Sequence, residues 1–168
     1  MRYHFWIHNA PVLLMCWRIS KFVQINRDLW IQQQSVYMGY REEAIECVRD
    51  HVLPLHRQIH AKYDGDFDRI YSEGYNSNSY QGRVIEPGKE YELSYLDCSC
   101  PKVKCGLRSN PEQCECSRQS ILFVLSQLEP DSQFDVRIEK TILRGGDRCT
   151  FRITRCAGMK RLTGRVEP

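Results

Sequence analysis

The most regular pattern of apolar residues in the chain lies between Tyr40 and Lys62. Its apolar positions step by three and four, the spacing of one face of an α-helix, at Ile45, Val48, Val52, Leu55 and Ile59. Glutamates gather in the first half of the segment and basic side chains near its end, as the helix macrodipole favours. Pro54 lacks an amide hydrogen. We therefore predict a helix that is kinked or split in two at this residue.

Strands are predicted where apolar and polar residues alternate, or where short segments lie between turn residues. Residues 91–95 alternate cleanly after a Pro-Gly turn and lead the chain directly to a pair of cysteines. Residues 69–71 and 83–86 are short segments between glycines and asparagines, and we predict strands or sheet edges there.

The last third of the pattern predicts a helix followed by a β-hairpin. The helix is capped by Ser117, ends before Pro130, and has one apolar stripe of Ile121, Val124, Leu125 and Leu128. Residues 134–139 and 149–153 then alternate as two strands, with the glycine pair at 145–146 as the turn between them.

This order of elements predicts an α+β fold, with an antiparallel sheet covered on one face by helices, in a single domain. We expect an N-terminal helical segment over residues 1–38, with a helix from about 12 to 33. An α+β ligand-binding-like domain is expected over 39–154, followed by a loose basic tail over 155–168.

Composition narrows the classes of function. The net charge of +3 is too small to indicate nucleic-acid binding, and no apolar run is long enough for a membrane helix, so neither partner is expected. The apolar residues 12–17 lack a signal-peptide cleavage site after them. The cysteine count of nine is odd, which favours a reducing, cytoplasmic location over a disulfide framework.

The loop over residues 97–117 carries the clearest candidate chemistry. It contains two Cys-x-Cys pairs, Cys98 with Cys100 and Cys114 with Cys116. Four thiolates are a tetrahedral ligand set for zinc, and the second pair comes just before a predicted helix, whose N-terminus favours thiolates. Reduced buried cysteines and a thiol–disulfide switch are the alternatives. Cys105 would be a spare ligand or a resolving thiol.

Cys149 and the histidine pair of the first helix each have a structural and a functional interpretation. Cys149 shares a strand face with Phe151 and Ile153, so it is either a core residue or a further metal ligand facing the cysteine loop. His56 and His60 are spaced as metal ligands on one helix face, although cationic residues are common at helix ends. No phosphate-binding glycine loop, nucleophile elbow or paired-carboxylate motif is present in the sequence.

Residues 91–154 carry a family resemblance. They place a Cys-x-Cys pair ahead of a helix, then a strand, a Gly-Asp turn and a Cys-x-Phe strand. This arrangement resembles small bacterial and archaeal aminothiazoline-carboxylate hydrolase-like proteins and, more distantly, 4-vinyl-reductase-type ligand-binding domains. The resemblance implies an α+β domain, often dimeric, that holds a small apolar or cyclic molecule between helices and sheet.

The same resemblance bears on the metal. In the vinyl-reductase-type sensors a zinc ion braces the pocket, held by a glutamate and two cysteines near the C-terminal hairpin. Cys149 corresponds to one of these cysteines, whereas Thr141 stands about where the other would be. The four thiols of the 97–117 loop would then replace the family's own arrangement.

Three functions follow as expectations. The first is a metal-braced small-molecule-binding protein, with zinc as the expected metal, a small apolar or cyclic molecule as the ligand and a homodimer as the expected assembly. The second is a hydrolase that opens a thiazoline-like or cyclic amidine ring, with a metal-bound water or a thiolate as the nucleophile. The third is a thiol redox or interaction module.

Overall fold

A computed structural model describes residues 39–156 of the chain. The chain divides into two units, residues 1–39 and 40–168, and all described residues but the first belong to the second unit. The helix expected over 12–33 and nearly all of the expected C-terminal tail lie outside the described residues. The last strand extends past the expected domain end, to Cys156.

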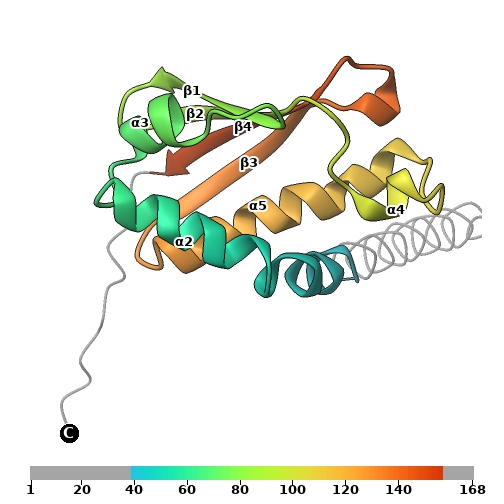
Figure 1. The fold of residues 1–168 in the computed structure, drawn as a ribbon, viewed down its shortest axis with the longest axis horizontal. Helices are drawn as coiled ribbons and strands as arrows, with labels where there is room; N and C mark the ends of the chain where they lie inside the picture. Colours follow the sequence, from blue (N-terminus) through green and yellow to red (C-terminus); the bar gives the residue numbers. More distant parts are fainter. Residues whose placement is uncertain (1–38, 157–168) are drawn as a thin grey trace, which may run out of the picture. The chain divides into compact units, whose positions relative to one another are not determined.

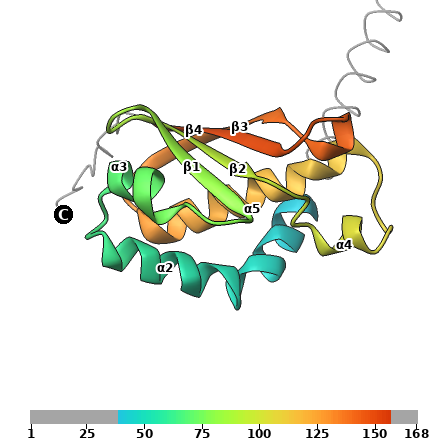
Figure 2. The ribbon, with the colours of Figure 1, turned by 45° about the horizontal axis from the view of Figure 1, so that its top comes forward.

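A four-stranded antiparallel sheet forms one layer of the fold. Its strands are β1 (Tyr80–Glu86), β2 (Glu90–Tyr95), β3 (Gln133–Lys140) and β4 (Cys149–Cys156), in the spatial order β1-β2-β4-β3. The longest helices lie together on one side of this sheet (Figures 1 and 2). The predicted α+β class and the predicted C-terminal hairpin are therefore confirmed.

The predicted helix over 40–62 is divided, but not at Pro54. Residues 39–49 are helical, a turn follows at 50–51, and α2 runs from Val52 to Lys62. Pro54 lies in the first turn of α2, where an amide hydrogen needs no helical partner. The break also shifts the helical phase. Leu53 is buried instead of Leu55, which is 47% exposed, so the predicted stripe is wrong at that residue.

The prediction of a strand at 69–71 is wrong. The chain forms the short helix α3 (Phe67–Arg69) and then a π-helical turn, η1 (Ile70–Gly74). The Asp66 side chain accepts a hydrogen bond from the Arg69 amide at 3.1 Å, which caps the start of α3. Phe67, Ile70 and Tyr71 have helical spacing and are all buried, so packing against the sheet selects the helical conformation.

The helix after the cysteine loop is α5 (Glu115–Leu128), and it ends before Pro130 as predicted. Its N-cap is Cys114, however, and the predicted cap Ser117 lies inside the helix. The capping box occurs one turn earlier, where Asn110 caps η2 (Pro111–Cys114). A short helix, α4 (Pro101–Lys104), occupies the first part of the loop, and η3 (Ile142–Arg144) lies between β3 and β4.

The main core lies between the sheet and the helices. Residues of the strands form one side of this core, and residues of α3, η1 and α5 form the other. Its most buried members include Tyr71, Tyr91, Val136, Phe151 and Ile153. A smaller cluster of Val48, Leu53 and Val124 joins the helix over 39–49 and α2 to α5. The helical layer therefore packs both on the sheet and on itself.

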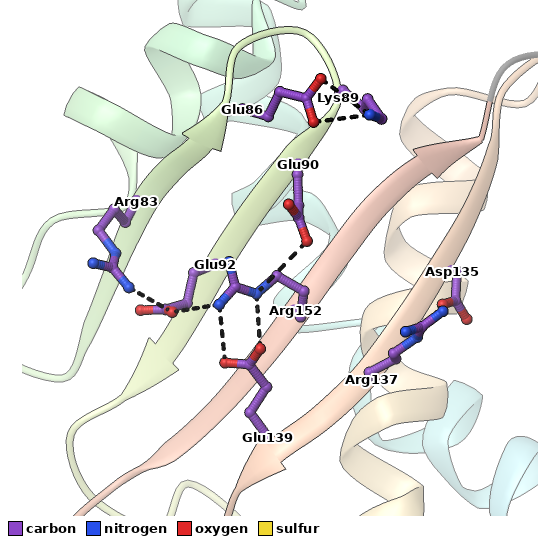
Figure 3. Close-up of polar contacts among 9 residues, drawn as sticks. All are labelled: Arg83, Glu86, Lys89, Glu90, Glu92, Asp135, Arg137, Glu139 and Arg152. Atoms are coloured by element: carbon purple, nitrogen blue, oxygen red, sulfur yellow. Dashed lines mark hydrogen bonds and ion pairs between the residues drawn. The ribbon is translucent and has the colours of Figure 1, made fainter.

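The opposite face of the sheet carries charges (Figure 3). Arg152 lies at its centre, 2.8 Å from Glu139 and within 4.0 Å of Glu90 and Glu92, and Arg83 pairs with Glu92 at 2.8 Å. No described helix covers these residues. Among the described helices, none has the length and apolar character needed to cross a bilayer.

Candidate functional site

Two neighbouring cavities lie between the sheet and the helical layer. The first, here called the aromatic cleft, has a volume of about 40 Å³ and is partly open to solvent. Its walls come from the helix over 39–49, α2, η1, β2 and α5, and they are formed by Val48, Val52, His56, Tyr71, Tyr75, Leu93, Tyr95, Ser120, Ile121, Val124 and Leu125. It is an apolar space with a few polar groups, the usual character of a small-ligand site.

The second cavity, here called the thiol cavity, is smaller, at about 10 Å³. Four cysteines line it, Cys98, Cys100, Cys114 and Cys149, together with the rings of Tyr95 and Phe151 and several smaller side chains. One water molecule needs roughly 10–15 Å³. The thiol cavity therefore has room for a single water-sized object and excludes an organic ligand.

The fold explains why these cysteines meet. Tyr95, the last residue of β2, pairs with Cys149, the first residue of β4. The chain that leaves β2 carries Cys98 and Cys100 past this point, and the N-cap of α5 places Cys114 at the same end. Segments that are distant in sequence thus bring four of the five predicted ligand thiols to one cavity.

The thiols influence one another electrostatically. Burial raises the pKa of Cys114, and Cys98 and Cys100 raise it further. Burial likewise raises the pKa of Cys149, with the other three thiols of the cavity adding to the rise. Since nearby like charges disfavour ionisation, each thiol of the cavity makes it harder to ionise its neighbours. A cation among them would reverse this balance.

Two donors beside the thiols are suited to thiolates. The Ile142 amide donates a hydrogen bond to the Cys149 sulfur at 3.5 Å and opposes the rise in the pKa of that thiol. The Thr141 hydroxyl is fully buried beside Cys114 and lowers its pKa, yet it has no hydrogen-bond partner of good geometry. A thiolate at Cys114 would give this hydroxyl the acceptor that it lacks.

Cys116, the fifth predicted ligand, lies apart from the thiol cavity. Burial raises its pKa, while the neighbouring Arg108 guanidinium opposes the rise. Arg108 also pairs with Glu43 of the helix over 39–49, as does Lys102. The Arg108 side chain is 7% exposed and its Nη1 is buried without a partner. Cys116 thus lies next to the Arg108–Glu43 ion pair, which connects the cysteine loop to this helix.

The remaining candidates separate into different surroundings. Cys105 is exposed and does not line the thiol cavity. The two histidines of α2 bind different partners: His56 faces Tyr75, whereas His60 lies 3.1 Å from Glu129. Within residues 39–156, no group of three or more His, Cys, Asp or Glu side chains is arranged to hold a metal ion. The four thiols would have to draw together to coordinate one.

The aromatic cleft contains a partly buried hydrogen-bonded pair that the sequence did not reveal. Nδ1 of His56 lies 2.6 Å from the Tyr75 hydroxyl, with the two rings edge to face. Burial lowers the pKa of His56 to about 4. The imidazole is therefore neutral at neutral pH, and the pair adds polarity to the cleft without adding charge.

A close backbone approach places the tyrosines of the cleft. A Cβ on Gly82 of β1 would lie 2.6 Å from the Tyr71 carbonyl oxygen and 2.9 Å from Cβ of Tyr75, so only glycine lets η1 pack this tightly. The π-helical turn then puts Tyr71 and Tyr75 on the cleft wall. The signal in the sequence was the helical spacing of aromatic residues over 67–75, which a strand prediction at 69–71 obscured.

Tyr95 connects the two cavities because its side chain lines both. Burial raises its pKa to about 12, and the nearby Cys149 thiol contributes to that rise. Its ring packs edge to face on Phe151, with centroids 5.8 Å apart. A rearrangement in the thiol cavity that moves Tyr95 would therefore also change the wall of the aromatic cleft.

The described residues define an α+β domain with a cleft between its sheet and its helices. No protein-family model matches the chain, and no curated protein matches it. The resemblance to hydrolase-like and vinyl-reductase-type domains stays a prediction.

Solved structures that are similar to the chain include two from different organisms. One is a crystal structure of trafficking protein particle complex subunit 3 from Naegleria fowleri, covalently bound to palmitic acid. It is 12% identical, covers 87% of this chain and 95% of its own, and has a TM-score of 0.43. The other is the NMR structure of the SO2144 H-NOX domain from Shewanella oneidensis in the Fe(II)CO state. It is 15% identical, covers 74% of this chain and 65% of its own, and has a TM-score of 0.41. Neither likeness is close enough to carry a functional argument.

Proposed function

We propose that this chain is a small-molecule-binding protein that holds a small apolar or cyclic ligand in the aromatic cleft and is braced by a zinc ion in the thiol cavity. The observation that carries this proposal is the position of Tyr95, which forms a wall of both cavities. A metal that fixes the cysteine loop would fix this wall, and hence the shape of the cleft.

Two features support zinc, and a third sets how its binding should depend on pH. The thiol cavity has room for one water-sized object and is lined by four cysteines, the number that closes a tetrahedral structural site. The Ile142 amide and the Thr141 hydroxyl are placed to donate to thiolates. Because burial raises the pKa of Cys114 and Cys149, metal binding must displace their protons. Zinc affinity should therefore fall as the pH falls.

The same features favour a structural over a catalytic metal. No Asp, Glu or His lines the thiol cavity among the described residues, so a metal-bound water would lack a neighbouring general base. Four thiolates also leave no open coordination position. The ring-opening hydrolase consequently stays a prediction without a supporting contact.

Metal analysis tests the brace. The full chain, purified under reducing conditions without chelator, should contain about one zinc per chain by elemental analysis, since four thiolates complete one site. Cys98→Ser and Cys149→Ser should lose most of it. Cys105→Ser, which alters an exposed thiol outside the cavity, is the matched control and should keep it. Wild-type protein without bound zinc, and unable to take it up on titration, would contradict the metal half of the proposal.

Ligand-observed NMR tests the cleft. Toluene, cyclohexene and 2-methyl-1-heptene are uncharged probes with one ring or one chain. A cavity of about 40 Å³ is smaller than the ~150 Å³ that holds benzene, so these ligands must extend into the open mouth or widen the cleft. Saturation transfer should appear with wild type and with Leu107→Phe, a change at an exposed residue, and should disappear with Val124→Phe, which fills the cleft. Equal transfer in all three proteins would contradict cleft binding.

The gathering of four free thiols also favours a second candidate, a thiol switch. A disulfide such as oxidised glutathione would accept two electrons from two cavity thiols, leaving one intramolecular disulfide and two reduced glutathione molecules. Counting free thiols after this treatment, with and without bound zinc, decides between the two. An unchanged count in the zinc-free protein would remove the switch.

A further inference from the structure

The aromatic cleft contains polar groups that lack partners within the protein. The His56 ring and the Tyr71 ring both line the cleft. Among residues 39–156, neither Nε2 of His56 nor the Tyr71 hydroxyl has a hydrogen-bond partner. Neither atom is completely buried, so each keeps some accessible surface. Tyr71 itself is only 1% exposed. Since both side chains line the cleft, these atoms are polar groups with which a ligand bound there could pair.

Hydrogen-bond counting assigns the proton on His56. If the Tyr75 hydroxyl donates to Nδ1, the neutral ring carries its proton on Nε2, and Nε2–H is the one unpaired polar group of the pair. If Nδ1 donated instead, the Tyr75 proton and the Nε2 lone pair would both be unpaired, because no other acceptor for that hydroxyl occurs among the described residues. The first arrangement leaves fewer unpaired groups and is preferred.

From this geometry we propose that the aromatic cleft selects an uncharged ligand with an apolar body and a hydrogen-bond acceptor, such as a ketone, ester or ether oxygen, which accepts from Nε2–H of His56. The Tyr71 hydroxyl offers a second donor among the residues that line the cleft. This inference depends on the cleft-binding half of the proposed function and adds the chemical class of the ligand to it.

The cleft disfavours charged ligands for the same structural reason. Its other wall residues are mainly aliphatic and aromatic, and no lysine, arginine, aspartate or glutamate lines it among the described residues. Burial lowers the pKa of His56 and raises the pKa of Tyr71, so both groups stay neutral. An ionic ligand would lose its hydration without gaining an opposite charge.

Three probes of similar shape that share a pentyl chain test the acceptor. They are 2-heptanone, its isostere 2-methyl-1-heptene, in which a methylene group replaces the oxygen, and hexanoate. Affinities are measured for the full chain, and the ketone-to-alkene affinity ratio is compared with that in His56→Phe. This comparison cancels the different solubilities of the probes in water. The ratio should be about 3- to 10-fold higher in wild type, the usual effect of one buried hydrogen bond. Hexanoate should bind at least about tenfold more weakly than the ketone, because it must lose its charge hydration.

The outcomes separate the two proposals. If none of the three probes binds, the cleft-binding function fails, and this inference fails with it. If ketone and alkene bind but their ratio is the same in wild type and His56→Phe, cleft binding stands and the acceptor role of His56 is wrong. Tighter binding of hexanoate than of the ketone would likewise overturn the inference.

A measurement without ligand keeps the inference testable if His56→Phe does not fold. Long-range ¹H–¹⁵N NMR spectra of wild type at pH 7 should show a neutral His56 with its proton on Nε2, and Tyr75→Phe should weaken that preference. A proton on Nδ1, or an imidazolium ring, would refute the proposed donor.

Discussion

Acidification should destabilise this protein through His56. Burial lowers the pKa of this side chain from 6.5 to about 4 in the folded chain, so the folded state binds fewer protons than the unfolded state between these values. The stabilising effect of a neutral His56 is therefore present above the unfolded pKa and is lost as the pH falls toward 4. Protonation would also remove the Nδ1 lone pair that faces Tyr75.

The magnitude follows from the two pKa values. A full difference of this size corresponds to about 3 kcal/mol of unfolding free energy. At pH 5, where the unfolded side chain is almost fully protonated and the folded one is mostly neutral, the loss relative to pH 8 should be about 2 kcal/mol.

Urea unfolding, followed by circular dichroism at pH 8 and pH 5, measures this loss. His56→Gln removes the titrating group while keeping an acceptor for the Tyr75 hydroxyl, so wild type should lose about 2 kcal/mol more than this variant. His51→Gln changes an exposed histidine of the adjacent turn and should behave like wild type. The same pH response in wild type and His56→Gln would refute the burial argument for His56.

Three further predictions concern other parts of the fold. Gly82→Ala should destabilise the chain by about 1–3 kcal/mol in urea unfolding, because its Cβ would lie 2.6 Å from a backbone oxygen of η1. In Gly39→Ala the added Cβ would meet no atom of another part of the chain within 4 Å, so this variant should not lower the unfolding free energy. Equal losses of stability in the two variants would contradict the close approach at Gly82. Glu43→Gln should cost about 2 kcal/mol, since it leaves the Arg108 guanidinium buried without its carboxylate, and an unchanged urea midpoint would count against that pair. Arg152→Gln should cost at most about 1 kcal/mol at low salt and less in 0.5 M NaCl, because the carboxylates around Arg152 are partly exposed; a loss that does not depend on salt would contradict an electrostatic role.

Local patterns in the sequence determined much of the architecture. Alternation identified β2 and the hairpin of β3 and β4, and the apolar stripe identified α5, because these elements bury one face against the same core. The break in the first helix was expected from Pro54, but it occurs at 50–51. Proline is tolerated in a first helical turn, so its presence alone does not locate a break.

The candidate site was only partly accessible from the sequence. The spacing of the cysteines indicated a thiol site, and Cys149 was one of its expected ligands, but nothing in the sequence showed that Cys116 would lie beside Arg108 and not line the thiol cavity. That outcome depends on the β2–β4 register and on the N-cap of α5 at Cys114, which are tertiary features. The cleft, its His56–Tyr75 pair and the wall that Tyr95 shares with the thiol cavity likewise arise from contacts between distant segments. A sequence specifies which faces are apolar over a few turns, whereas the meeting of side chains across a core depends on packing among all the elements at once.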